Sequence, residues 1–366
     1  MRNEAHNLHV QNIVNGPVRR LQAVGKSQAD HSDLQPETNK RYCLMCRLEF
    51  VGAVSHCPQD GTPLVVMSDP FIGSVVQDKY QVLRQVGRGA MGTVYAAREL
   101  DTDAIIALKV LHRSLVSDLR AVKRFQAEAS HTSQLSSPHT ISTEDYGFTD
   151  DGRPFMVMDF VEGRGLNTIL DDETIDLARG LKILIQIADG LAHAHDQGLV
   201  HRDVKPSNIM IVADEATGDD IVKIVDFGIS KSVMDIEESI TQTGQVVGSP
   251  LYMSPEQCLG DVLDHRTDIY SLGCLMYHLL TGTTMFHAET VVEMLQAQIG
   301  RMPRAMSAVK KDLPRDLDQI MYKAVAKDPA MRYQSMQEYA TALRLCYMRL
   351  CNRPKVQVDT ADISAA

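Results

Sequence analysis

The sequence predicts an α+β fold with two lobes, a small β-rich lobe followed by a larger helical one. Short β-type runs dominate the first part, at Tyr80–Val86, Val94–Arg98, Ile105–Val110 and Phe155–Phe160. One helical stretch, from Leu119 to about Leu135, interrupts them. After Leu166 apolar residues recur at helical spacing, as in Leu177–His195, Ser271–Leu280, Val291–Ile299 and Leu317–Val325. Such segregation of strands from helices predicts two packed lobes with a cleft between them.

Length and charge restrict the classes of function. The 366 residues suffice for one large or two modest domains. Lys and Arg number 37 against 47 Asp and Glu, so the net charge is −10, and such a field attracts neither nucleic acid nor an anionic membrane. No apolar run approaches the roughly 18–20 residues that span a bilayer. The first 20 residues contain no apolar block typical of a secretory signal.

The seven cysteines fall into two groups. Three lie close together between residues 43 and 57, and the other four are scattered between residues 258 and 351. An odd and uneven set of this kind is not typical of a disulfide-stabilised secreted domain. The sequence therefore predicts a protein of the reducing cytoplasm.

Composition divides the chain into four parts. Residues 1–39 are polar with no sustained period, so we expect them to be disordered. Residues 40–67 form a small Cys-bearing unit, and a short connector then leads into a large domain over residues 80–350. Within that domain we expect the β-rich lobe to cover residues 80–161 and the helical lobe residues 162–350. Residues 351–366 form a C-terminal tail.

A glycine-rich motif separates the first two strands of the large domain. Gly87, Gly89 and Gly92 stand at a spacing that lets backbone N–H groups approach phosphates, which any Cβ would hold away. The glycines alone are a weak signal, because a dinucleotide-binding turn shows the same glycines and a plain hairpin turn is a further alternative. Here they lie between two strands rather than before a helix, which favours a phosphate-covering hairpin.

A lysine interrupts the apolar strand that follows. Lys109 ends the run Ile106-Ala107-Leu108-Lys109, and a buried ammonium group is costly without a partner. Glu128, on the following helix, is a candidate partner that would hold Lys109 on the phosphates. The alternative is an edge-strand lysine in solvent with an unrelated helix glutamate; the glycine motif favours the ion pair.

The segment from His201 to Asn208 is the most specific motif in the chain. It places Asp203, Lys205 and Asn208 in one loop after a helix that ends near Gly198. Asp203 can accept a hydroxyl proton, Lys205 can neutralise charge on a transferred phosphoryl group, and Asn208 can ligate Mg²⁺. Asp226, in Asp-Phe-Gly after an apolar strand, supplies a second oxygen ligand for such a cation.

Taken together, these motifs resemble those of the bacterial eukaryotic-like (Hanks-type) serine/threonine protein kinases over residues 80–350. The resemblance implies the two-lobed protein-kinase fold. It also implies transfer of the γ-phosphate of ATP, with Mg²⁺ or Mn²⁺, to Ser and Thr hydroxyls of protein substrates. The catalytic residues would be Asp203, Lys205, Lys109 and Glu128. The residues around ATP would be Gly87, Gly89, Gly92, Val94, Ala107, Lys109, Met158, Asp159 and Val161.

The resemblance extends to three structural residues and to the substrate side. Ser254-Pro255-Glu256 stands where the family has Ala-Pro-Glu, and Arg332 resembles the usual ion-pair partner of that glutamate. Asp268 resembles the buried carboxylate that braces the catalytic loop. Ser249 replaces the usual Thr in the loop that receives the substrate hydroxyl.

A polar segment lies between Asp226 and Glu256 and contains Thr241 and Thr243. Arg202, next to the catalytic Asp203, is a cation that phosphate on this segment would pair with. We therefore predict autophosphorylation at Thr241 or Thr243, which would order the segment. The alternative is a solvated loop with incidental threonines.

Two positions depart from the family pattern. Thr132 lies four residues after Glu128, where the family has an apolar residue that packs toward Phe227. Glu144 stands where an aromatic or aliphatic strand residue is usual. A polar pair between helix and sheet would weaken the active arrangement, so we expect a modest basal activity that a partner or phosphorylation raises.

The Cys-bearing unit resembles zinc-ribbon modules that precede some bacterial kinases. Cys43, Cys46 and Cys57 supply three thiolates for the tetrahedral shell that structural zinc requires. A regular second knuckle has a cysteine where this chain has Asp60, so either Asp60 or His56 would complete the shell. A metal-free knuckle is the alternative. The knuckle could also contact a protein partner.

Two other classes of function remain to be weighed. A pseudokinase would use the same fold as a scaffold, but the set Lys109, Glu128, Asp203, Asn208 and Asp226 is complete. A small-molecule phosphotransferase of related fold is disfavoured by the Ser-Pro-Glu segment and the long loop before it. The sequence leaves open whether the chain forms a dimer.

Overall fold

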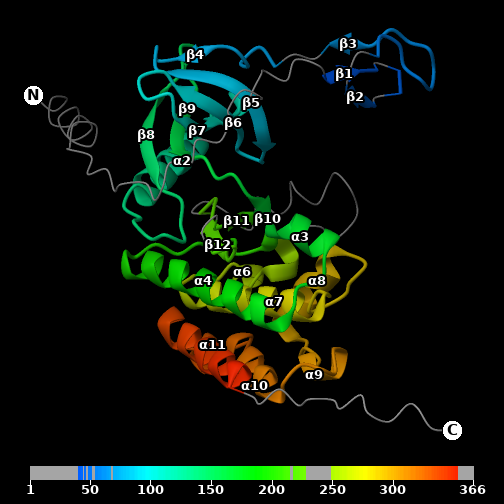
Figure 1. Ribbon diagram of the computed structural model, residues 1–366, viewed down its shortest axis with the longest axis vertical. Helices are drawn as coiled ribbons and strands as arrows, with labels where there is room; N and C mark the ends of the chain where they lie inside the picture. Colours follow the sequence, from blue (N-terminus) through cyan, green and yellow to red (C-terminus); the bar gives the residue numbers. More distant parts are fainter. Residues whose placement is uncertain are drawn as a thin grey trace, which may run out of the picture. The chain divides into compact units, whose positions relative to one another are not determined.

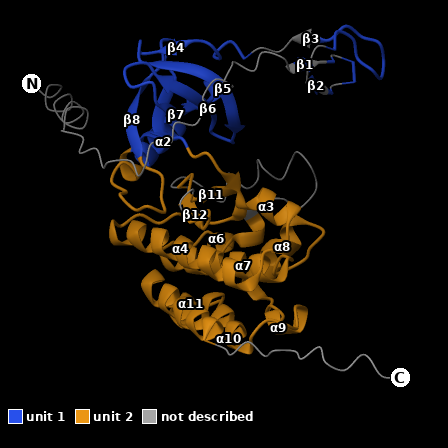
Figure 2. Ribbon diagram, viewed as in Figure 1, with its two compact units in different colours: residues 1–129, 143–160 blue, residues 130–142, 161–366 orange. Residues whose placement is uncertain are grey.

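The protein is described here from a computed structural model. The structure describes residues 40–43, 45–46, 48–51, 54–66, 69–214, 217–227 and 249–352. The predicted disordered segment 1–39, most of the predicted tail, and both Thr241 and Thr243 lie outside these residues. Figure 2 shows two compact units, residues 1–129 with 143–160 and residues 130–142 with 161–366.

The Cys-bearing part of the first unit is a three-stranded antiparallel sheet. Its strands β1 (Lys40–Tyr42), β2 (Glu49–Val51) and β3 (Val65–Val66) have the order β2-β1-β3. Cys43, Cys57 and Leu64 form its small core. A tight turn closes from the Cys57 carbonyl to the Gly61 amide over 2.9 Å, and Gly61 has a φ of 71°, a left-handed conformation that favours glycine.

The rest of the first unit is a six-stranded antiparallel sheet with one helix (Figure 1). The sheet order is β4-β5-β6-β7-β9-β8. One face of this sheet carries an apolar cluster that includes Val82, Leu108 and Phe155. The elements are β4 (Val75–Val76), β5 (Tyr80–Arg88), β6 (Gly92–Glu99), β7 (Ile105–Leu111), α2 (Leu119–Thr132), β8 (Thr143–Phe148) and β9 (Pro154–Asp159).

The second unit is mostly helical. Its small sheet consists of β10 (Arg164–Gly165), β11 (Ile209–Ala213) and β12 (Asp220–Ile224). None of the helices in the described part of the chain has the length and apolar character that a bilayer span requires. The helices are α3 (Leu166–Asp172), α4 (Leu177–Asp196), α6 (Pro255–Leu259), α7 (Arg266–Thr281), α8 (Val291–Gly300), α9 (Met306–Val309), α10 (Arg315–Ala324) and α11 (Met336–Cys351).

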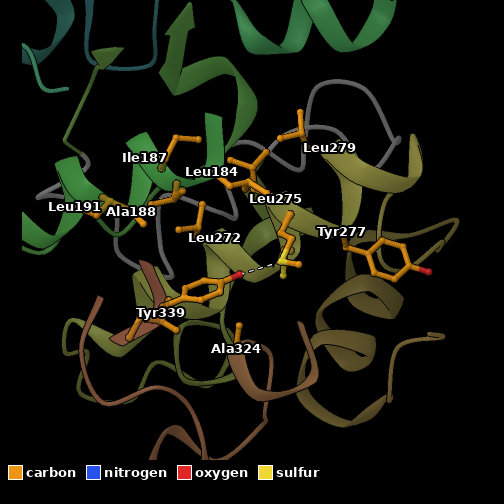
Figure 3. Packing of buried hydrophobic residues seen from close by; sticks show 14 of the residues in the cluster. Leu184, Ile187, Ala188, Leu191, Leu272, Leu275, Tyr277, Leu279, Ala324 and Tyr339 are labelled. Atoms are coloured by element: carbon orange, nitrogen blue, oxygen red, sulfur yellow. Dashed lines mark hydrogen bonds between the residues drawn. The ribbon is translucent and has the colours of Figure 1, made fainter. Parts of the chain in front are cut away.

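Helices α4, α7, α10 and α11 build the core of this unit. Asp176 caps α4 by accepting hydrogen bonds from the Ala178 and Arg179 amides, and its apolar face follows helical spacing. Figure 3 shows this face packed against residues of α7, and the Tyr339 hydroxyl of α11 lies 3.3 Å from the Met276 sulfur. This core holds the loop that follows α4, which carries Asp203.

Candidate active site

The glycine-rich motif forms the hairpin between β5 and β6. The Gly89 amide donates to the Gly92 carbonyl over 2.9 Å. His112 holds the same hairpin from outside the motif: its Nε2 lies 2.8 Å from the Gly89 carbonyl, and its amide donates to the Met91 carbonyl over 2.9 Å. The sequence reasoning missed His112, because nothing in the local spacing links it to the glycines.

The three glycines of the hairpin differ in the space around them. A Cβ on Gly87 would meet no atom within 4 Å, and one on Gly89 would lie 3.8 Å from its nearest neighbour. These two positions leave open space, as a phosphate-covering hairpin requires. A Cβ on Gly92 would lie 2.5 Å from the Val110 carbonyl, so β7 itself excludes a side chain there.

The predicted ion pair between Lys109 and Glu128 is present in the first unit. Lys109 Nζ donates to Glu128 Oε1 over 2.7 Å, and the two side chains are only 12% and 7% exposed. The pair joins β7 to α2. A salt bridge this buried needs both partners, because the loss of either one leaves the other charge desolvated.

Most of the residues predicted around ATP lie on neighbouring strands of the same sheet. Val94 pairs with Lys109 across β6 and β7, and Ala107 pairs with Met158 across β7 and β9. Asp159 is the exposed last residue of β9. Val161 belongs to the second unit. The contacts of these residues with ATP remain predictions.

The residues of the catalytic motif are in direct contact in the second unit. Lys205 Nζ lies 2.9 Å from Asp203 Oδ2. Asn208 Nδ2 donates to both the carbonyl and Oδ2 of Asp203, each over 2.9 Å. With its nitrogen engaged in these bonds, Asn208 has its carboxamide oxygen left to ligate a cation.

Asp268 fixes the backbone of this loop. Its carboxylate accepts hydrogen bonds from the His201 and Arg202 amides, each 2.8 Å long, and lies 2.8 Å from His195 Nε2. Burial opposes ionisation of Asp268, but its hydrogen bonds outweigh that effect, so its pKa is lowered. A buried carboxylate therefore holds Arg202 at a positive φ of 65°, a strained conformation that orients Asp203.

The residues on either side of Asp226 contact the same loop. The Val225 amide donates to the Asn208 carbonyl over 2.9 Å, and the His201 ring lies 4.7 Å from the Phe227 ring. Asp226 has a φ of 52°, unusual for a residue with a side chain. Asn208 and Asp226 thus supply neutral and anionic oxygen donors on adjoining segments, a donor set suited to Mg²⁺.

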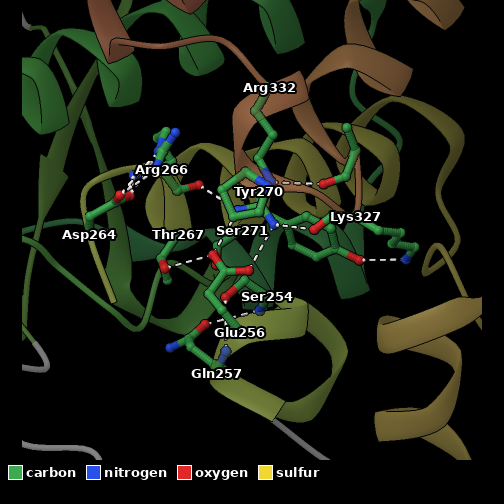
Figure 4. Close-up of polar contacts among 12 residues, drawn as sticks. Ser254, Glu256, Gln257, Asp264, Arg266, Thr267, Tyr270, Ser271, Lys327 and Arg332 are labelled. Atoms are coloured by element: carbon green, nitrogen blue, oxygen red, sulfur yellow. Dashed lines mark hydrogen bonds and ion pairs between the residues drawn. The ribbon is translucent and has the colours of Figure 1, made fainter. Parts of the chain in front are cut away.

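Glu256 and Arg332 form the predicted ion pair, which Figure 4 shows in its surroundings. The two terminal guanidinium nitrogens of Arg332 donate to the carboxylate of Glu256 over 2.7 Å, and the Thr267 hydroxyl donates to the same carboxylate over 2.9 Å. The neighbouring Gln257 donates to the Arg202 carbonyl over 2.8 Å. The pair is therefore linked to the catalytic loop through α6.

Side chains of α7 and α8 bind backbone carbonyls of the segment that begins at Ser249. Gln298 Nε2 donates to the carbonyls of Pro250 and Leu251 over 3.2 and 2.8 Å. The Ser271 hydroxyl donates to the Tyr252 carbonyl over 2.7 Å. The backbone of this segment is thus fixed on α7 and α8, whereas the role of Ser249 in receiving the substrate remains a prediction.

The two departures from the family pattern lie in different environments. Thr132 is the last residue of α2 and is only 4% exposed. Glu144 is exposed and falls where the pairing of β8 with β9 is irregular, between Thr143 and Asp145. Of these two residues, only Thr132 is a buried polar group. The hypothesis of a weakened active arrangement therefore rests on Thr132 alone.

We expect a Thr132→Leu variant to raise the basal rate of phosphate transfer by a few-fold, because it restores the apolar side chain that the family has at this position between helix and sheet. Initial rates of the unphosphorylated chain would show this. A Glu144→Tyr variant is the control and should leave the rate unchanged. An equal rate for wild type and Thr132→Leu would contradict the hypothesis.

The candidate metal ligands of the Cys-bearing unit converge. The Sγ atoms of Cys43, Cys46 and Cys57 and a carboxylate oxygen of Asp60 lie within 4.8 Å of one another. His56 Nδ1 instead lies 3.1 Å from the hydroxyl of Ser55. Hydrogen bonds from Thr62 lower the pKa of Asp60, which keeps it an anionic donor. Of the two predicted fourth ligands, Asp60 is the one that the fold brings to the thiols.

Comparison with known proteins is consistent with these motifs. Residues 80–343 match the protein kinase domain family. The serine/threonine-protein kinase pkn3 of Myxococcus xanthus is 36% identical over 282 residues, which cover 76% of this chain and 51% of that protein. PknB of Mycobacterium tuberculosis is 36% identical over 300 residues, which cover 80% of this chain and 46% of that kinase. The chain spans about half the length of the curated relatives it matches.

A solved structure supports the same assignment. The kinase domain of Mycobacterium tuberculosis PknI has a TM-score of 0.58 and 29% sequence identity with this chain, covering 75% of the chain and 98% of that domain. The predicted fold class and family are thereby confirmed. The chain belongs to the protein kinase family, among the bacterial Hanks-type serine/threonine kinases.

Proposed function

We propose that the chain is an active protein kinase that transfers the γ-phosphate of ATP to serine and threonine hydroxyls of proteins. The cluster of Asp203, Lys205 and Asn208, braced by buried Asp268, carries this proposal. Asp203 would accept the hydroxyl proton, and Lys205 would stabilise charge on the transferred group. Family membership implies ATP and a divalent cation. Asn208 and Asp226 would hold that cation, which we infer is Mg²⁺ or Mn²⁺ and which neutralises phosphate charge when bound.

The test is transfer of ³²P from γ-labelled ATP to a generic acceptor protein by the full chain, with Mg²⁺, with Mn²⁺ and with chelator. We expect cation-dependent incorporation that acid hydrolysis recovers as phosphoserine and phosphothreonine. Recovery of phosphotyrosine alone, or of no label in protein, would overturn the proposal. Comparison of the two cations at equal concentration identifies the preferred one.

We further infer that phosphorylation of Thr241 or Thr243 activates the enzyme. Replacement of both by alanine should lower the rate on the order of tenfold, because the segment then lacks the phosphate that pairs with Arg202. Steady-state rates and the mass of the purified chain would be measured together. Thr341→Ala, an exposed threonine on α11, is the control and should change neither. Full activity of the double variant would contradict the inference.

We also propose that the Cys-bearing unit binds one zinc ion through Cys43, Cys46, Cys57 and Asp60. Elemental analysis of the full chain should give one equivalent of zinc. An Asp60→Ala variant should retain clearly less zinc after dialysis against a weak chelator, whereas His56→Ala should retain the full equivalent. Equal retention by the two variants, or no zinc in the wild type, would refute this ligand set.

The remaining proposals concern the setting of the enzyme. All seven cysteines lie in the described part of the chain and none forms a disulfide there, which supports a reducing compartment such as the cytoplasm. Protein substrates follow from the family. A protein partner of the Cys-bearing unit and a dimer stay predictions from the sequence.

A further inference from the structure

A segment before the predicted kinase domain is built into its first sheet. We call residues 69–76 the strap. Its last two residues form β4, which pairs with β5, and two backbone hydrogen bonds of 2.8 and 2.9 Å join Gly73 and Ser74 to Val82. Phe71 belongs to the apolar cluster on that face of the sheet and is only 9% exposed. The strap is therefore part of the sheet rather than a connector.

Asp69 fixes the start of the strap to β6. Its Oδ1 accepts a hydrogen bond from the Phe71 amide over 3.0 Å, and its Oδ2 accepts one from the Tyr95 hydroxyl over 2.6 Å. The Phe71 and Tyr95 rings lie 5.1 Å apart, and the Arg153 guanidinium lies 4.6 Å from the Phe71 ring. Burial, with the neighbouring Asp69, raises the pKa of Tyr95, so its hydroxyl remains a donor.

Tyr95 lies where β6 leaves the glycine-rich hairpin. It follows Val94, whose strand partner is Lys109, and side chains alternate between the faces of a strand. Tyr95 therefore lies on the face of Phe71 and Leu108, whereas Val94 and Lys109 lie on the face predicted to contact ATP. The strap thus contacts this strand on the face opposite its predicted ATP-contacting residues.

Much of the hairpin is exposed, although His112 binds its Gly89 and Met91 carbonyls. Arg88, Gly89 and Ala90 are all exposed, as are Gln85 and Val86 before them. A hairpin with few buried contacts takes its position from the strands at its base. At the base of β6, Tyr95 reaches outside the sheet strands to the strap, through its hydrogen bond to Asp69 and its ring contact with Phe71.

We propose that Tyr95 is a positioning residue for ATP binding, held by Asp69 of the strap. This inference rests on the proposed kinase function. Without the hydrogen bond, the base of β6 is less constrained and the hairpin spends less time in its ATP-binding position. The cost falls on nucleotide affinity, because Asp203 and Lys205 belong to the other unit. Such a change raises KM for ATP and leaves kcat nearly unchanged.

The structure supplies a matched control. Tyr80 lies in the same apolar cluster, and its hydroxyl donates to an aspartate, Asp145, over 2.7 Å. It pairs with Glu99, at the opposite end of β6 from the glycine-rich hairpin. A Tyr80→Phe variant therefore loses this part-buried hydrogen bond, together with the one that Lys79 Nζ donates to the same hydroxyl over 2.7 Å. Both losses lie at the end of β6 where the hairpin should not respond.

The test compares Tyr95→Phe, Asp69→Asn and Tyr80→Phe in the full chain. We measure KM for ATP, kcat, the thermal midpoint, and the Kd of Mg²⁺–ATP by calorimetric titration. Tyr95→Phe and Asp69→Asn should raise KM and Kd by about threefold to tenfold, with kcat within about twofold of wild type. Tyr80→Phe should lower the thermal midpoint at least as much as Tyr95→Phe and leave Kd unchanged.

The outcomes separate this inference from the proposed function. Equal Kd values for all variants and wild type would overturn the positioning role, as would an equal rise in Kd for Tyr80→Phe. A wild-type chain that binds ATP but transfers no phosphate would contradict the proposed function alone, because Kd still reports on Tyr95. A chain that binds no ATP would overturn both.

Discussion

An Asp203→Asn variant of the full chain is expected to transfer phosphate about 10²–10⁴-fold more slowly than wild type, the range typical for loss of a general base. The carboxamide has nearly the shape of the carboxylate but cannot accept the hydroxyl proton. The substitution also removes the negative charge that lies 2.9 Å from Lys205 Nζ. Initial rates at saturating ATP, with and without the acceptor protein, measure the effect.

Two further measurements make this result specific to the chemical step. The Kd for Mg²⁺–ATP should change little, because Asp203 is not among the predicted ATP contacts. An Asp219→Asn variant removes the same charge from an exposed pair with Lys182 in the same unit and should keep the wild-type rate. A rate for Asp203→Asn within twofold of wild type would show that phosphate transfer occurs without this base.

The long elements of the fold could be predicted because their local patterns agree with their burial. Helix α4 combines an Asp176 cap with an apolar face, and its observed end at Asp196 lies one residue beyond the predicted one. Helix α2 ends at Thr132, three residues before the expected limit. Strand β4 consists of Val75 and Val76 alone and gives no periodic signal; it forms because β5 offers an edge.

Helix α11 was not predicted from the sequence. Met336, Tyr339, Ala340 and Leu343 follow helical spacing behind an N-cap at Ser335, so the signal was available in the residues. These side chains are all but fully buried in the core of the second unit. The helix therefore lies almost wholly inside the domain predicted for residues 80–350, in a stretch for which no element was predicted.

The candidate site was predictable where its residues are close in sequence. Asp203, Lys205 and Asn208 lie within six residues, and their contacts follow from one loop. Residues that brace the site from afar carry no such signal. Gln257 reaches the Arg202 carbonyl across 55 positions, and Gln298 reaches Leu251 across 47. Such partners depend on how helices pack, which one sequence does not specify at the level of single side chains.

The largest effect on stability is expected from the pair of Glu256 and Arg332. Arg332 is fully buried and donates two hydrogen bonds of 2.7 Å to Glu256, with three more to the carbonyls of Ala326, Arg266 and Lys327. An Arg332→Ala variant removes the charged donor of the Glu256 carboxylate and a donor of each of these carbonyls. Loss of one partner of a buried pair costs about 3–5 kcal/mol. Arg332→Lys should recover only part of it, because an ammonium cannot bind both carboxylate oxygens in the same geometry.

Urea unfolding of the full chain, followed by circular dichroism, would measure this loss. Arg349→Ala is the matched control: its ion pair with Asp316 is 3.1 Å long but exposed, so its removal should cost less than about 1 kcal/mol. Equal losses for the two variants would show that burial of the Arg332 pair contributes nothing.

The dependence of stability on pH follows from the same pair. Burial opposes the ionisation of Glu256, but the hydrogen bonds and charge of Arg332 outweigh it, so the pKa of Glu256 in the folded chain lies below its ordinary value of 4.5. Its contribution to stability is therefore complete above pH 4.5 and is lost as the pH falls through the lower, folded-state pKa. A Glu256→Gln variant, already destabilised at neutral pH, should lack this acid-dependent loss. The difference in unfolding free energy between wild type and Glu256→Gln should thus shrink as the pH falls below 4.5, and a difference that stays constant would exclude Glu256 as the titrating group.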